Sequence, residues 1–118
     1  MNGNITAILQ VRTTSKNAIG ESIKKWIDVM IFTGFLDLSG GDSKYSTFDA
    51  KIQESTHVFI CDYKPIPATL EVNDKVVKVS AESCRMVTNS KYYDVMLIDN
   101  PMELNKHLEI YLKYTGVQ

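Results

Sequence analysis

Apolar residues recur at every second position in several short segments of the chain, which is the pattern of β-strands with one buried face. The clearest alternation lies in residues 107–115, and a second lies in residues 5–13. We therefore expect both segments to be strands with one dry face and one wet face. The expected inward positions are Leu108, Ile110, Leu112 and Tyr114 in the later segment, and Ile5, Ala7, Leu9 and Val11 in the earlier one.

Two further strand-like stretches lie between these segments. Residues 14–22 are polar and predict a turn, after which residues 24–38 form a β-branched and aromatic run that is long for one strand. Gly34 in the interior of that run predicts a bulge or a tight bend. Residues 56–63 alternate again, and Pro65 ends this strand because proline cannot donate a hydrogen bond to a sheet.

The second half of the chain predicts tight hairpins and very little helix. A helical turn is expected at residues 101–106, with Asn100 as its N-cap and Pro101 as its first residue, and residues 47–54 could form another. Asparagine-centred turns predict two hairpins. The first joins residues 69–72 to 75–80 through Asn73 and Asp74, and the second joins residues 85–88 to 92–99 through residues 89–91.

Together these elements predict a mainly β protein that forms one domain over residues 1–118. About six to eight short strands in a chain of this length favour a small β-barrel or a sandwich, with one short helix. Residues 39–55 interrupt the pattern with a polar, glycine-containing segment. A connection of that length inside a compact domain is usually functional or disordered, so we expect a long inserted loop.

The composition excludes several classes of protein but does not indicate a particular chemical activity. The 13 basic and 14 acidic residues give a formal net charge of −1, which argues against a strongly basic nucleic-acid coat. No apolar run is long enough to span a membrane, and we expect no signal peptide from the first residues. Two cysteines, Cys61 and Cys84, are too few for a disulfide framework. We expect both to be reduced thiols in an intracellular protein.

Catalytic and metal-binding patterns are weak in this sequence. His57 and Cys61 share a strand face but stand roughly 13 Å apart, too far to bind one ion as a local pair. Nothing in the sequence links His107 or Cys84 to them, and no pair of carboxylates stands out. Gly40–Gly41 lacks the Lys-Ser/Thr ending of a phosphate-binding loop. We therefore expect a protein that is not an enzyme and that holds no metal or cofactor.

A small barrel could instead bind nucleic acid through aromatic side chains and a basic groove. This alternative depends on tyrosines and lysines that alternate along two expected strands near the end of the chain. The acidic residues mixed among them favour an ordinary solvated sheet face. The residues concerned are Tyr92, Tyr93, Tyr111, Tyr114, Lys91 and Lys113.

The ordered set WIDV, GFLDL, ESTHVFICDY, YYDVMLIDNP and HLEIYLKY resembles the head-closure proteins of tailed bacteriophages and prophages. These are also called head-completion or head–tail connector stopper proteins. The likeness covers residues 24–63 and 85–115, and it is nearest to the branch found in prophages of Gram-positive bacteria. It implies a small β-barrel with a short helix and a long inserted loop at residues 39–55.

The resemblance also implies a function and a set of partners. The chain would form a dodecameric ring in the virion neck, between the portal adaptor and the tail terminator, after assembly in the host cytoplasm. Its loops would converge on the channel and retain packaged DNA, which passes without sequence-specific binding. Within the loop, Tyr45, Phe48 and Ile52 are the side chains able to bury against neighbouring copies. Six lysines on expected strands would protect exposed edges before assembly: Lys24, Lys25, Lys75, Lys78, Lys91 and Lys113.

Overall fold

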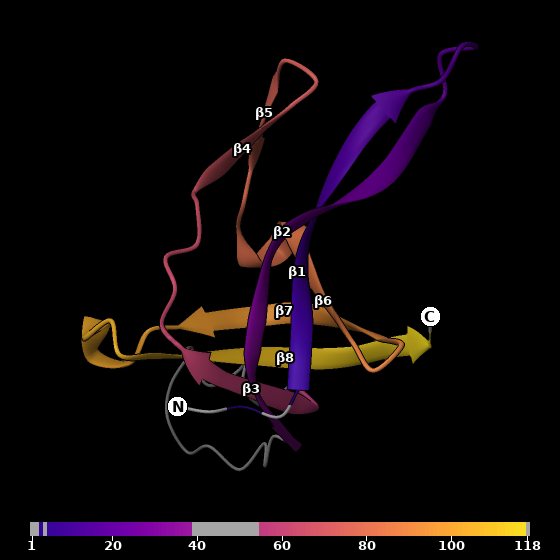
Figure 1. Ribbon diagram of the computed structural model, residues 1–118. Coiled ribbons are helices and arrows are strands. Elements are labelled where there is room, and N and C mark those ends of the chain that lie inside the picture. Colours follow the sequence, from indigo (N-terminus) through magenta and orange to yellow (C-terminus); the bar gives the residue numbers. More distant parts are fainter. Residues whose placement is uncertain (1–2, 4, 39–54, 118) are drawn as a thin grey trace.

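The computed structural model describes Gly3, residues 5–38 and residues 55–117. In these parts the chain is almost entirely β-structure, with two single 3-10 turns (Figure 1). The elements in chain order are β1 (Ile5–Lys16), β2 (Ser22–Leu38), β3 (His57–Asp62), β4 (Thr69–Val72), β5 (Lys75–Lys78), η1 (Ala81–Ser83), β6 (Cys84–Thr88), β7 (Lys91–Asp99), η2 (Pro101–Glu103) and β8 (His107–Val117).

Six strands close into a ring in the order β1-β2-β3-β8-β7-β6, and every neighbouring pair is antiparallel. We call this closed sheet the barrel. The hairpin β4–β5 stands apart as a two-stranded sheet. The mainly β barrel expected from the sequence is therefore confirmed, with eight strands in the described residues, six of them in the ring.

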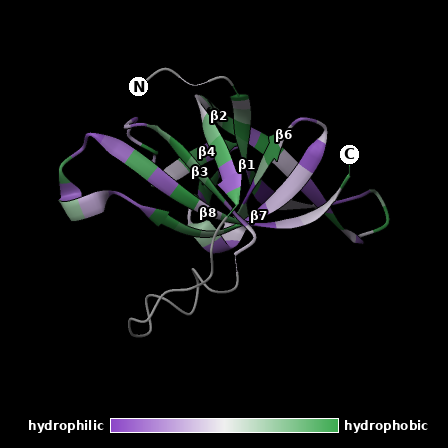
Figure 2. Cartoon of the chain, turned by 90° about the horizontal axis from the view of Figure 1, so that it is seen from below, coloured by the Kyte–Doolittle hydropathy of each residue, from purple (hydrophilic) through white to green (hydrophobic). Residues whose placement is uncertain are grey.

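The interior of the barrel is filled by the inward positions of all six strands. Apolar and polar bands alternate along the strands where the ring is seen from below (Figure 2). The expected inward residues of β1 and β8 are buried, except that Ile5 is half-buried and Tyr114 is 40% exposed. The burial expected for Tyr114 is wrong because this residue lies beyond the filled interior. The largest fully buried side chains are Phe32, Phe59, Leu9, Met86, Ile110, Leu112, Val11 and Cys61.

Part of β1 and β2 extends beyond the ring as a two-stranded ribbon. β1 pairs with β6 only from Ile8 to Val11, whereas its pairing with β2 continues to Lys16 opposite Ser22. We call residues 12–26 the first arm. The polar turn expected at residues 14–22 is therefore wrong in extent, because strand structure continues into it on both sides. A strand with both faces in water needs no apolar alternation, so its polar residues resemble a turn.

The β4–β5 hairpin forms a second arm (residues 69–78), and it confirms the expected hairpin at this position. Asn73 and Asp74 both adopt positive φ angles of 49° and 64°, which a tight two-residue turn requires. Asn89 and Ser90 do the same between β6 and β7, with φ angles of 51° and 61°. This second turn contains two residues, one fewer than expected.

β2 has an irregularity and a change of partner along its length. Leu9 pairs with Met30 but Gln10 pairs with Asp28, so Val29 is an extra residue and forms a bulge. The bulge expected at Gly34 therefore lies five residues earlier. Gly34 marks instead the point where β2 passes from β1 to β3, pairing with both. A Cβ atom there would lie 2.2 Å from the carbonyl oxygen of Ile60, so only glycine allows this approach.

The helical turn expected at residues 101–106 is only a 3-10 turn, η2, over Pro101–Glu103. Asn100 occupies the N-cap position but makes no capping bond to the turn with its side chain. Its amide instead donates to the side-chain oxygen of Asn105 at 2.7 Å, and it accepts from the Asn105 backbone N–H at 3.1 Å. Met102 and Glu103 have positive φ angles, which no regular helix tolerates.

Candidate functional site

The loop residues expected to face a channel, Tyr45, Phe48 and Ile52, lie outside the described residues. The structure does describe the strands on either side of that loop. Leu38, the last residue of β2, pairs directly with His57, the first residue of β3. The intervening segment is therefore an insertion between two hydrogen-bonded neighbours in the barrel wall. The length of this segment therefore does not affect the strand pairing of the wall.

Thr56 fixes the point where the chain returns from that insertion into the wall. Its backbone N–H donates to the carbonyl oxygen of Leu112 at 2.8 Å, which continues the β3–β8 ladder. Its hydroxyl oxygen accepts from the backbone N–H of Tyr114 at 2.8 Å and lies 2.8 Å from Nδ1 of His57. One threonine thus ties the strand start to β8 through both backbone and side chain.

His57, at the start of β3, is packed in a group of three rings. Its imidazole meets Tyr93 edge-on at 5.1 Å, and Tyr93 meets Tyr114 at 5.7 Å. Burial, and then the positive charge of Lys91, lower the pKa of His57. A neutral imidazole in an aromatic contact fits the structural role expected from the sequence better than a catalytic one.

The four tyrosines considered for nucleic-acid stacking do not share one exposed surface. Tyr93 is buried in the barrel, whereas Tyr92 lies on the outside and stacks against the guanidinium of Arg85 at 4.0 Å. Trp26 covers the other side of that guanidinium at 4.2 Å. Arg85 also donates from Nε to the side-chain oxygen of Gln10 at 2.8 Å. This stack joins three strands of the wall, and sequence spacing gave no sign of it.

The two cysteine thiols are buried rather than exposed to solvent. Cys61 and Cys84 are both buried and unpaired. Burial raises the pKa of Cys61 to about 11, and burial likewise raises the pKa of Cys84. A nucleophilic cysteine needs the opposite shift, toward thiolate at neutral pH. Among the described residues, no group of three or more His, Cys, Asp or Glu side chains is placed to hold a metal ion.

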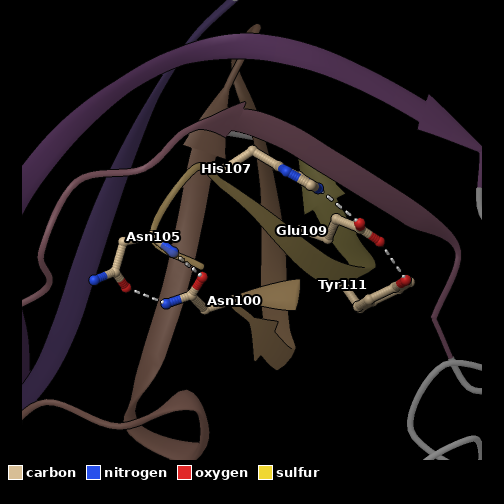
Figure 3. A network of polar contacts seen from close by, with 5 residues as sticks. All are labelled: Asn100, Asn105, His107, Glu109 and Tyr111. Carbon is tan, nitrogen blue, oxygen red and sulfur yellow. Dashed lines mark hydrogen bonds and ion pairs between the residues drawn. The ribbon is translucent and has the colours of Figure 1, made fainter. Parts of the chain in front are cut away.

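A polar network lies on the wet face of β8 (Figure 3). Glu109 accepts from the Tyr111 hydroxyl at 3.0 Å and lies 3.0 Å from Nε2 of His107. Burial, and then the hydrogen bond to Glu109, raise the pKa of Tyr111 to about 12. The β7–β8 register places Asp99 directly opposite Glu109. Burial, and then that carboxylate, raise the pKa of Asp99, while His107 opposes the rise.

This network pairs two carboxylates that the sequence did not distinguish from the others. Their hydrogen bonds and charge contacts on this sheet face give the two carboxylates a structural explanation. Strand register, which the sequence does not reveal, was the missing information.

The largest described hollow lies between the two arms and has a volume of about 350 Å³. Its lining includes three cationic side chains and no carboxylate. Ile27 and Val76 supply apolar surface there. No sequence pattern indicates this site, because it depends on two hairpins that extend from the barrel side by side. The cationic lining residues are Arg12, Lys25 and Lys75.

No known protein family matches this sequence, and no curated protein matches it either. Among the described residues there is no helix long and apolar enough to cross a membrane. A functional proposal therefore depends on the geometry of the barrel, of the strand ends at Leu38 and His57, and of the two arms.

Proposed function

We propose that this chain is a structural subunit of the head–tail connector of a tailed bacteriophage or prophage. It closes the DNA channel after packaging and joins the portal adaptor to the tail terminator. The observation that supports this best is the pairing of Leu38 with His57 at the two ends of residues 39–56. A rigid wall that extends a long loop from a single point is what a stopper needs, because the loop can reach a channel without disturbing the subunit.

The arms support the assembly part of the proposal. A ring needs a heterologous contact, in which one surface of a subunit meets a different surface of the next. Both arms are two-stranded, so each exposes a strand edge and side chains beyond the barrel. Lysines are exposed on both arms, as a subunit that must stay soluble before assembly requires. These are Lys24, Lys25, Lys75 and Lys78.

The charge of the chain fits a channel through which DNA moves. Sequence-independent DNA affinity comes mostly from lysine and arginine contacts to phosphates. With a net charge of −1, the subunit lacks the overall positive field that would hold DNA in place. Retention of DNA then depends on a physical obstruction rather than on adhesion. The lack of an overall positive field also accounts for the passage of DNA without sequence-specific binding.

The test is to replace residues 39–54 with a short Gly-Ser linker in assembling particles. The barrel should keep its thermal midpoint to within a few degrees, because loop length affects stability only weakly. Necks should assemble, and the particles should package DNA and then leak it. As a matched control, the turn at residues 17–21 in the first arm is replaced in the same way, and these particles should keep their DNA. Full DNA retention by the loop variant would overturn the proposal.

A small-barrel nucleic-acid-binding module is the alternative, and the cationic hollow between the arms favours it. Titration with single-stranded and double-stranded DNA separates the two functions. A dedicated binder should show an affinity that falls steeply with salt, together with quenching of aromatic fluorescence. A stopper subunit should show only weak binding at physiological salt. Tight salt-dependent binding that Lys25→Glu abolishes would favour the alternative.

A further inference from the structure

We propose that the turn between β7 and β8 of one copy docks into the hollow between the two arms of the next copy. The docking element consists of Met102, Glu103 and Leu104, which we call the knob. This inference rests on the ring proposed above and identifies the contact that builds it. The partner is a second copy of this chain, bound head to tail.

The knob presents apolar surface that the described residues leave largely uncovered. Met102 is 86% exposed and Leu104 is 55% exposed, with the carboxylate of Glu103 between them in sequence. Exposed large apolar side chains that lie together on a projection are typical of contact surfaces. Because an acidic residue lies between two apolar ones, a complementary surface must offer positive charge beside apolar area.

The knob is held in one shape before any partner arrives. The two hydrogen bonds between Asn100 and Asn105 close the base of the turn (Figure 3). Inside it, the Glu103 backbone N–H donates to the Asn100 carbonyl oxygen at 2.8 Å. Because the turn is already ordered, docking loses little further conformational entropy.

The hollow between the arms offers the matching surface. Lys25 from the first arm and Lys75 from the second line it, together with Arg12, and no carboxylate lines it. None of these three cations makes an ion pair with a carboxylate in the described parts of the chain. Val76 is 68% exposed and supplies apolar surface beside them. A carboxylate flanked by apolar side chains fits this lining in both charge and polarity.

The positions of the knob and the hollow require contact between different copies. Figure 1 shows the knob at one end of the β7–β8 pair, whereas the arms rise from another side of the barrel. A contact between two different surfaces leaves a free hollow on the first copy and a free knob on the second. Such a contact continues from copy to copy, and it forms a ring when the rotation between neighbours closes. The shape of the subunit therefore agrees with cyclic assembly.

Engineered disulfides test the contact in the full chain. Leu104→Cys in one population and Val76→Cys in another are mixed with oxidised glutathione. The cross-linked heterodimer should form at least about tenfold more than between Leu104→Cys and Val117→Cys, a control with an equally exposed valine on β8. The native thiols are buried and contribute little background. Equal yields from the two mixtures would overturn the inference.

Charge reversal then tests the complementarity. Glu103→Lys, added to the Leu104→Cys chain, should lower the yield about tenfold. Reversing Lys25 and Lys75 to glutamate in the Val76→Cys chain should restore it. A yield that does not change with these substitutions would refute the docking.

A chain that carries both cysteines separates this inference from the ring itself. Leu104→Cys/Val76→Cys should form a ladder of multimers that ends in a closed species. A closed ring of the unmodified chain, with no cross-link in the double variant, would refute the contact and leave the ring standing. An open polymer that never closes would support the contact and refute the ring.

Discussion

The first arm continues two strands of the barrel wall and the second arm is a separate hairpin, but both arms obey different constraints from the wall. In the wall, each strand has a neighbour on both sides and one face against the interior, so apolar residues alternate with polar ones. In the arms, two strands stand with both faces largely in water. A two-stranded hairpin by itself is only marginally stable, because it buries little apolar surface. The comparison teaches that stability resides in the wall, and that the arm residues are available for contacts.

The largest expected effect comes from removing a buried side chain of the wall. Ile110 in β8 is fully buried, so Ile110→Ala should lower the free energy of unfolding by about 2–5 kcal/mol. Ile19, at the exposed tip of the first arm, provides the matched control. Ile19→Ala should change stability by less than about 0.5 kcal/mol. Denaturant midpoints measure both, and equal losses would mean that the arm is part of the core.

A smaller effect is expected at the glycine where β2 changes partners. Gly34→Ala would place a methyl group against the backbone of Ile60, so we expect a loss of about 1–3 kcal/mol. Gly116 in β8 has open space around the corresponding position. Gly116→Ala should therefore be neutral, and the two thermal midpoints can be compared directly. If Gly34→Ala leaves the thermal midpoint unchanged, the backbone of the wall can shift at this point as readily as that of an arm.

The smallest effect concerns the wet face of the wall. The folded-state pKa of Asp99 lies above its ordinary value of 3.8, owing to burial and to Glu109. The native state therefore holds this proton more tightly than the unfolded chain does. The free energy of unfolding falls as the pH rises from the unfolded-state pKa of Asp99 to its folded-state pKa. Asp99→Asn should raise the thermal midpoint slightly near neutral pH, and this gain should vanish at about pH 3, where both states are protonated. A gain that persists unchanged in acid would contradict this explanation.

The wall was predictable because its signals are local. The alternation in β8 predicted the burial of Ile110 and Leu112, and Asn89 and Ser90 predicted the hairpin turn between two strands of the wall. These signals act through contacts between the side chain and its own strand or turn. Closure of the ring was expected only as one of two all-β possibilities, since it depends on pairings between distant strands.

The features missed by the sequence depend on register and on packing. The bulge at Val29 has no sequence signature, because it arises from the relative register of β1 and β2. The Arg85 stack and the Asp99–Glu109 pair each join strands whose relative offset the sequence leaves open. Residues 14–22 predict a turn rather than strand ends because the solvated strands of the first arm lack alternation. The predicted loop residues Tyr45, Phe48 and Ile52 lie outside the described structure, so their role stays a prediction.

The continuity of β2 gives the subunit a mechanical property. This single strand runs from Ser22 in the first arm to Leu38 at the start of the loop, a path of about 50 Å along the backbone. No flexible linker interrupts it. A load applied to the first arm would pass along covalent bonds to Leu38, and sliding is resisted because a one-residue slip would turn Phe32 out of the interior. The first arm and the far end of β2 are therefore coupled mechanically through one continuous strand.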